Sequence, residues 1–127
     1  MSQQTDPTAP EFEAEIRRRL TLHESLTGEM LDDLASEDWD TYQDGKDSFE
    51  SYAEDYTWRH RSIFRIYLSS GPASEHLDVY VDDRLEPHRV VFHLELPAGG
   101  TSIRVSFGSP LFLYAAMALD AFGDFAY

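Results

Sequence analysis

Carboxylates are the most numerous ionisable groups in this chain of 127 residues, and many of them are spaced closely enough to act together on a cationic partner. Asp and Glu number 24 against 10 Lys and Arg, for a formal charge of −14 at pH 7. Twelve of the acids lie within residues 24–55, where Lys46 is the only base. Residues three and four apart on a helix are neighbours. A helix over this segment would therefore carry one row of acids, namely Glu29, Asp33, Glu37, Asp40, Asp44 and Asp47, with Glu54 seven residues further on.

Such a row has the electrostatic pattern of a nucleic-acid strand. Duplex DNA carries one charge per ~1.7 Å of helix axis over both strands, so carboxylates at helical spacing approximate the phosphates of one strand. A protein with this face could occupy the basic groove of a protein that binds DNA or RNA and compete with its true ligand. The alternative interpretation is a solvated helix face, and the sequence leaves the two close to even.

Motifs for metal binding and common enzyme chemistry are missing from the sequence. An EF-hand loop needs oxygen ligands at positions 1, 3 and 5 and Gly at position 6. In the segment that starts at Asp38, positions 5 and 6 hold Tyr42 and Gln43, which do not match. The chain also lacks an HExxH pair, a GxSxG serine elbow and a phosphate-binding GxxxxGK[ST] loop. We therefore expect no catalytic residue, no metal site and no cofactor.

The five histidines give little support for a cluster. His88 and His93 stand five residues apart in a predicted strand, so their side chains point to opposite faces. His76 belongs in or beside the neighbouring strand, and it meets His88 or His93 only in a register that the sequence does not fix. We interpret each histidine as structural or exposed.

Five arginines are expected on one face of the predicted sheet, namely Arg59, Arg61, Arg65, Arg89 and Arg104. This face could form a small nucleic-acid platform. It also holds the acids Asp78, Asp82 and Glu95, so cross-strand ion pairs explain it adequately. The acidic helices could also dock onto these arginines, which would neutralise part of the acidic row.

Composition excludes several classes of protein. The chain has no Cys, so it has no disulfide, no cysteine zinc site and no thiol nucleophile. No apolar run approaches the ~20 residues of a membrane span, and the acidic first fifteen residues do not resemble a signal peptide. A chain this acidic does not hold nucleic acid by its net field. These features predict a cytoplasmic protein with no direct contact to membranes or nucleic acid.

A halophilic origin is another explanation for the acidity. Halophilic proteins spread their acids over the whole surface, whereas residues 56–127 of this chain hold eight acids and six arginines. We therefore favour a localised acidic patch.

Helices are predicted for the acidic part of the chain. Residues 1–9 lack periodicity and indicate a disordered tail. Pro10 suits the first position of a helix that Gly28 ends or bends. Leu31 and Leu34 continue the apolar stripe in a second short helix.

A further helix is predicted to start at Ser36, as its N-cap, and to run to about Asp55. Tyr42 and Phe49 stand seven residues apart in it and are expected to face the core. Gly45 favours a kink in this helix.

The apolar period changes to two after the acidic part, which predicts strands. Four are expected, over residues 58–69, 77–81, 90–96 and 103–107. Ser109 and Pro110 then predict the N-cap and first residue of a closing helix, with Gly123 as its C′ residue. The fold class is therefore α+β, with N-terminal acidic helices, a four-stranded antiparallel meander sheet and a C-terminal helix. We expect one domain over residues 10–127, with the acidic helical part at 10–55 and the sheet and final helix at 56–127.

The concentration of acids over Glu24–Asp55, the small size and the lack of catalytic motifs resemble DNA-mimic inhibitors carried by phages and plasmids, the anti-CRISPR and antirestriction proteins. The resemblance is one of charge pattern and implies no fold, since those families share none. The stretch from Phe64 to Leu94 (FRIYLSSGPASEHLDVYVDD…RVVFHLEL) also resembles small uncharacterised proteins of mobile elements, which carry a strand, an LS-G-P turn and further strands. Their second glycine before the proline is replaced here by Ser70.

These resemblances imply a non-catalytic inhibitor that acts as a DNA mimic in the host cytoplasm. Its partner would be a protein with a basic nucleic-acid-binding groove, such as a CRISPR effector subunit or a restriction enzyme. The alternative is an acidic adaptor for a basic protein partner, without competition with nucleic acid. A metal-dependent or acid–base enzyme ranks below both.

The inhibitor could be a monomer or a homodimer, and the apolar end with Phe125 and Tyr127 could support a dimer. The predicted partner-binding residues are ten acids and two aromatic anchors, of the types that dominate interface hot spots. They are Glu29, Asp32, Asp33, Glu37, Asp38, Trp39, Asp40, Tyr42, Asp44, Asp47, Glu50 and Glu54.

Overall fold

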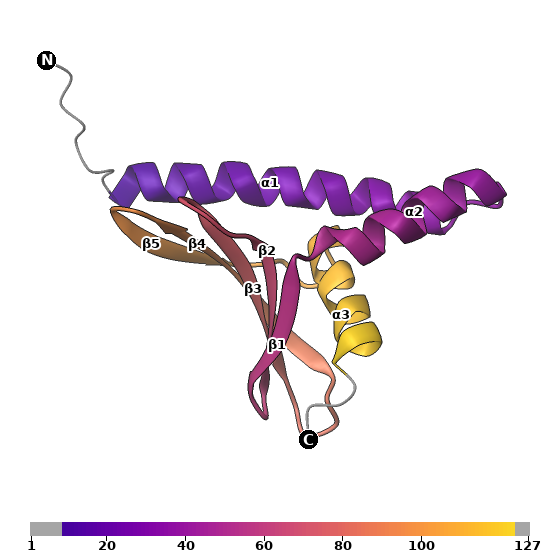
Figure 1. Ribbon diagram of the computed structural model, residues 1–127. Coiled ribbons are helices and arrows are strands. Elements are labelled where there is room, and N and C mark those ends of the chain that lie inside the picture. Colours follow the sequence, from indigo (N-terminus) through magenta and orange to yellow (C-terminus); the bar gives the residue numbers. More distant parts are fainter. Residues whose placement is uncertain (1–8, 124–127) are drawn as a thin grey trace, which may run out of the picture.

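A five-stranded antiparallel sheet with helices packed on one of its faces makes up the fold (Figure 1). The computed structural model describes residues 9–123. The elements are α1 (Ala9–Leu34), α2 (Trp39–Tyr52), β1 (Asp55–His60), β2 (Ile63–Ser69), β3 (Ser74–Val81), β4 (Pro87–Leu96), β5 (Gly99–Arg104) and α3 (Pro110–Phe122). The strand order is β1-β2-β3-β4-β5. The predicted α+β class and antiparallel meander are confirmed.

The predicted number of strands is wrong by one. The stretch 58–69 is not one strand, because it folds into β1 and β2 around a turn at Arg61 and Ser62. Trp58 on β1 pairs with Phe64 on β2, so both side chains lie on the same face of the sheet although the chain reverses direction between them. The turn contains none of the Gly, Asn or Asp residues that usually mark a hairpin. Alternation therefore continued through the sequence without a signal of the break.

The predicted end of the first helix at Gly28 is also wrong. α1 runs without interruption for 26 residues, so the separate short helix around Leu31 and Leu34 is its last turn and a half. Gly28 marks a contact instead, since a Cβ built there would lie 3.6 Å from the Pro110 side chain at the start of α3. Met30 is 3% exposed and extends the buried stripe beyond the glycine. Tertiary packing thus outweighs the low helix propensity of glycine.

α2 is shorter than predicted at both ends. Asp38, not Ser36, is its N-cap, because the Asp38 carboxylate accepts a hydrogen bond of 3.0 Å from the Thr41 amide. The helix ends at Tyr52, and the Glu54 amide already donates to the Tyr67 carbonyl of the sheet at 2.8 Å. Strand pairing therefore competes with the last turn of the predicted helix.

Gly45 allows a close approach of two helices and does not interrupt α2. A Cβ built at Gly45 would lie 2.7 Å from Asp33 Cβ and 2.9 Å from the Leu34 amide nitrogen. α2 therefore folds back against the last turns of α1, and both helices extend past the sheet (Figure 1).

The core lies between the sheet and the helices. Its fully buried sheet residues come from one face, with Phe64, Leu77 and Phe92 on successive strands. α3 contributes Leu111, Tyr114, Ala115 and Ala118, and α1 contributes Ile16 and Met30. The predicted N-cap of α3 is confirmed, because Ser109 Oγ accepts from the Phe112 amide at 3.4 Å. Gly123 does end α3, yet its φ of −87° is not the left-handed conformation expected of a C′ glycine.

Within residues 9–123, no helix has both the length and the apolar composition needed to cross a membrane. The tail predicted over residues 1–9 lies outside the described residues except for Ala9, with which α1 begins. Phe125 and Tyr127, invoked for a dimer, also lie outside them.

Candidate functional site

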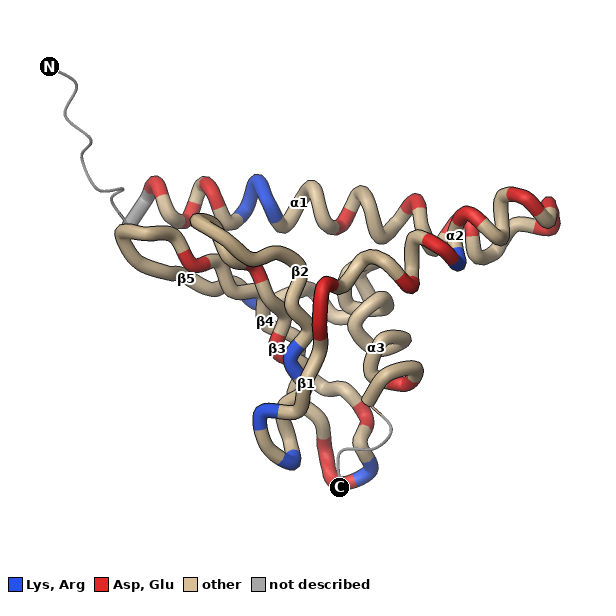
Figure 2. Tube along the Cα trace, in the orientation of Figure 1, with Lys and Arg blue, Asp and Glu red and all other residues tan. Residues whose placement is uncertain are grey.

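The predicted acids lie at the end of the helical pair that extends past the sheet. We call residues 29–54, from the last turns of α1 to two residues past the end of α2, the acidic hairpin. Figure 2 shows its acidic positions along the turn and α2, with a single basic position among them. The sheet and the rest of α1 carry the arginines. The acidic hairpin is therefore a surface of nearly uniform charge.

The ten predicted acids of the hairpin are accessible. Asp33 is half-buried and the other nine are exposed. None of the ten forms an ion pair with another residue of the range 9–123. Asp38 is occupied as the cap of α2, and hydrogen bonds from the Thr41 amide and hydroxyl lower its pKa. Glu54 accepts one hydrogen bond of 3.0 Å from Ser70.

The acids do not form the single row that the sequence predicted. Glu29, Asp32 and Asp33 lie on α1, Glu37 and Asp38 lie in the turn, and Asp40, Asp44, Asp47 and Glu50 lie on α2. α2 folds back at this turn, so the step from Asp33 to Asp40 does not follow one helix. Steps of three and four residues hold only within each helix. The charges are therefore distributed over both helices and the turn of the hairpin instead of following one line.

Within residues 9–123, no ion pair joins an arginine of the sheet to an acid of the acidic hairpin. Arg65 makes a bidentate pair with Asp78 of the neighbouring strand, with N–O distances of 2.8 and 3.0 Å. The Arg89 guanidinium lies 4.0 Å from the ring centroid of Tyr80. The cross-strand explanation of the arginine face is confirmed for Arg65.

Two aromatic residues were predicted as anchors at the turn end of the hairpin. Trp39 is 69% exposed, and its ring centroid lies 6.0 Å from that of half-buried Tyr42. Phe49, further along α2, instead packs against the rings of Tyr114 and Phe122 at 5.5 and 5.7 Å. The start of α2 thus presents aromatic surface, whereas its last turn attaches the hairpin to the core.

A buried polar network at the base of the hairpin was missed by the sequence analysis. A hydrogen bond joins the Tyr52 hydroxyl to His23 Nδ1, and His23 Nε2 lies 3.2 Å from Glu75 Oε2. Arg19 Nη1 lies 3.5 Å from the same oxygen, and Ser69 Oγ donates to Oε1 of Glu75 at 3.0 Å. The network therefore connects α1, α2 and the sheet.

The charges of this network are set by its members. Burial by itself would raise the pKa of Glu75, but hydrogen bonds from His23 and Ser69 and the charge of Arg19 outweigh it and lower the pKa. Burial raises the pKa of Tyr52. One signal could have revealed the network: Glu75 has the same strand parity as Leu77 and Val79, and hence faces the core.

One group among the described residues could hold a metal ion, namely His76, Asp78 and His93. It lies on β3 and β4, on the sheet face opposite the core, and not on the acidic hairpin. No metal site is predicted from the sequence, because the motifs leave the register of the histidines open. The β3–β4 register pairs His76 directly with His93.

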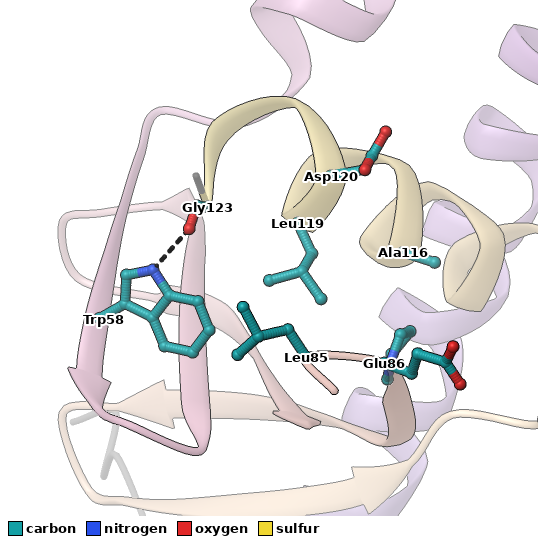
Figure 3. Close-up of a pocket in the computed structure, with 8 residues that line it drawn as sticks. Trp58, Leu85, Glu86, Ala116, Leu119, Asp120 and Gly123 are labelled. Atoms are coloured by element: carbon teal, nitrogen blue, oxygen red, sulfur yellow. Dashed lines mark hydrogen bonds between the residues drawn. The ribbon is translucent and has the colours of Figure 1, made fainter. Parts of the chain in front are cut away.

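The pocket in Figure 3 offers no catalytic pair. It has a volume of about 290 Å³ and lies between α3 and the loop that connects β3 and β4. Leu85, Leu119 and Trp58 supply its apolar walls, and Trp58 Nε1 donates to the Gly123 carbonyl at 2.9 Å. Its charged residues are two acids, Glu86 and Asp120. This pocket has no nucleophile with an adjacent base.

The fold and the surface describe this protein in structural terms, as an α+β protein with an acidic helical hairpin beside a five-stranded antiparallel meander. Comparisons with protein-family models, with curated proteins and with solved structures found no match.

Proposed function

We propose that this protein is a non-catalytic inhibitor of a bacterial defence complex that binds nucleic acid, of the anti-CRISPR or antirestriction kind. It acts as a DNA mimic, and the acidic hairpin is the surface that its partner binds. The observation that supports the proposal is the set of ten carboxylates that surround the hairpin without an ion pair inside residues 9–123.

Unpaired like charges are costly for the free protein. Like charges three or four residues apart on a helix destabilise it by ~0.2–0.5 kcal/mol per pair. Asp40, Asp44 and Asp47 have this spacing, and Lys46 is the only base of the hairpin. A cationic groove relieves this repulsion on binding, and its field accelerates the encounter of the two proteins.

The shape of the molecule suits insertion into a groove. α1 and α2 extend past the sheet, so the hairpin can enter a groove while the sheet stays outside (Figure 1). Trp39 is exposed near the start of α2 and supplies an aromatic anchor beside the charges. The partner is then a protein with a basic nucleic-acid-binding groove, such as a CRISPR effector subunit or a restriction enzyme in the host cytoplasm.

The test uses two variants of equal net charge. The hairpin variant carries Asp40→Asn, Asp44→Asn and Asp47→Asn, none of which removes a side-chain hydrogen bond within the described residues. The control carries Asp83→Asn, Glu86→Gln and Asp120→Asn, which are exposed acids outside the hairpin.

Wild type and both variants serve as bait in a bacterial lysate. The partner that they capture is then loaded with fluorescent duplex DNA, and the release of this DNA is measured as each protein is added. Wild type and the control should capture the same partner and release its DNA, whereas the hairpin variant should need at least ~10-fold more protein for the same release. Equal potency of the two variants would overturn the proposal.

The acidic adaptor is the second candidate function, and the geometry gives it one argument. The charges occupy two helices and a turn, so they do not reproduce the spacing of one phosphate strand. A basic protein partner needs no such spacing. In the same assay the adaptor predicts capture that depends on the hairpin acids while the partner keeps its DNA.

A further inference from the structure

Three potential metal ligands meet on the sheet face that the described helices do not cover. β3 and β4 pair His76 with His93, and Asp78 follows two residues after His76 on the same face. Leu77 and Val79, which alternate with them, are fully buried on the core side. The two histidines and the aspartate therefore share the outer face, at adjacent positions of two central strands.

The distances among these side chains are short enough for one ion. The ring centroids of His76 and His93 are 4.6 Å apart, and one ligand atom from each of the three residues lies within 4.8 Å of the others. His93 Nε2 is 3.3 Å from Asp78 Oδ2. Ligand atoms of a four-coordinate zinc ion are ~3.3 Å apart, given its bond lengths of about 2.0–2.1 Å. The longest of these separations would have to close by up to about 1.5 Å, and because the two rings are stacked at an interplanar angle of 20°, at least one ring must also turn before both nitrogens point at one ion.

Both histidines carry a shielded nitrogen that no hydrogen bond satisfies. His76 is 5% exposed, and its Nε2 atom has no hydrogen-bond partner among the described residues. The same holds for His93 Nε2, whose approach to Asp78 lacks the geometry of a hydrogen bond. Buried polar atoms without partners are uncommon in folded proteins, so two of them beside one carboxylate indicate a ligand.

We propose that His76, Asp78 and His93 form a binding site for Zn²⁺ on the outer face of the sheet. Two imidazoles and one carboxylate are a donor set that Zn²⁺ accepts, with its fourth position open to water or an added ligand. Arg65 holds the Asp78 carboxylate through two hydrogen bonds and fixes its orientation, in the manner of outer-shell partners of metal ligands. The ion replaces the contact between Asp78 Oδ2 and His93 Nε2.

Neighbouring charges act on the ion in both directions. The guanidinium of Arg65 opposes a cation, whereas Glu95 on β4 favours one, since its charge already favours protonated His76. The site lies on the sheet and shares no residue with the acidic hairpin. It is therefore independent of the proposed inhibitor function.

Calorimetric titration of the full chain with Zn²⁺ tests the site, with excess Mg²⁺ present to occupy the exposed carboxylates. Wild type should bind one equivalent, and His93→Asn should weaken the binding at least ~10-fold. His88→Asn is the matched control, because His88 is exposed near the start of the same strand, and it should bind as wild type does. Absence of a stoichiometric event, or equal affinity of His93→Asn, would overturn the proposal.

A second measurement needs no variant and covers the case in which His93→Asn fails to fold. In ¹⁵N-labelled wild type, one equivalent of Zn²⁺ should shift the ring-nitrogen resonances of His76 and His93 while those of exposed His60 and His88 stay in place. Shifts confined to the exposed histidines, or no shift at all, would refute the site.

Discussion

The carboxylates at the two ends of α1 differ in whether they form ion pairs. Toward the N-terminal end, Glu15 accepts from Arg18 and Arg19 at 2.6 Å each, and Arg19 also lies 3.5 Å from Glu75 on the sheet. Toward the other end, Glu29 and Asp32 are exposed and form no ion pair with residues 9–123. The same helix therefore carries a neutralised region and a uniformly charged one.

This contrast shows that the excess of acid is local. Some carboxylates on the body of the molecule, such as Glu75 and Asp78, are contacted by arginines and histidines, whereas Asp83, Glu86 and Asp120 there form no ion pair within the described residues. Where they lie on the acidic hairpin, which extends past the sheet, such contacts are missing within the described residues. The hairpin therefore carries its charge at a place that a partner can reach.

Removing a paired carboxylate gives the largest effect that the contrast predicts. Asp78→Asn leaves the Arg65 guanidinium, whose side chain is 17% exposed, without its counter-charge. We expect the free energy of unfolding to fall by about 3 kcal/mol, because breaking a buried pair leaves one charge uncompensated. Urea denaturation of variant and wild type measures this change. A loss below ~1 kcal/mol would show that the sheet pair is no more valuable than a surface pair.

The attachment of the hairpin is tested at Gly45, with Gly28 of α1 for comparison. Gly45→Ala forces a Cβ to within 2.7 Å of Asp33 Cβ, so it should destabilise the protein by roughly 1–3 kcal/mol through overpacking. Gly28→Ala is the matched control, since its Cβ would lie at an ordinary 3.6 Å from Pro110. That variant should gain up to ~1 kcal/mol from helix propensity. Thermal unfolding followed by circular dichroism measures both, and equal effects would contradict the tight helix contact.

Acid should destabilise the paired region. Hydrogen bonds from Arg18 and Arg19 lower the pKa of Glu15 from 4.5 to about 2, and the pKa values of Glu75 and Asp78 are lowered as well. A folded-state pKa below the unfolded one gives stability that is present above the unfolded pKa and lost as pH falls. The free energy of unfolding should therefore decrease from about pH 4.5 downward.

Denaturant titrations over this pH range measure the decrease. The slope should be shallower in Asp78→Asn, which lacks one of the three carboxylates, and at least as steep in the hairpin variant with Asp40, Asp44 and Asp47 neutralised. An identical slope in Asp78→Asn would remove the sheet pair from the explanation.

The smallest effect has the opposite sign. Asp44→Asn removes the repulsion of Asp44 by Asp40 and Asp47, so the protein should gain a few tenths of a kcal/mol. Glu15→Gln is the matched control in the paired region, where the same neutralisation should cost a few tenths of a kcal/mol. The difference between the two in urea denaturation is the informative quantity. Two losses of equal size would mean that the hairpin carboxylates have stabilising partners.

Sequence periodicity was sufficient for much of the fold. Alternation located β3 and β4, and Ser109-Pro110 defined the start of α3, because these signals arise from local geometry. The break between β1 and β2 and the continuity of α1 through Gly28 were missed. The first is a turn without turn residues, and the second depends on packing against Pro110, which is remote in sequence.

The residues of the candidate sites were likewise predictable from the sequence only in part. The exposed acids and Trp39 were chosen from composition and spacing, and their role in binding stays a prediction. The reversal of direction between α1 and α2, which separates the acids, depends on Gly45 fitting against Asp33 and could not be read from spacing. The pairing of His76 with His93 depends on strand register, which alternation alone leaves open.

The salt dependence of partner binding tests the central claim most directly. The dissociation constant of the captured partner is measured over a series of salt concentrations for wild type and for the variant with Asp40, Asp44 and Asp47 changed to Asn. Our account predicts a steep weakening with salt for wild type and a clearly shallower one for the variant, because fewer exposed charges are then screened. Binding that is insensitive to salt, or equal slopes for the two proteins, would contradict it.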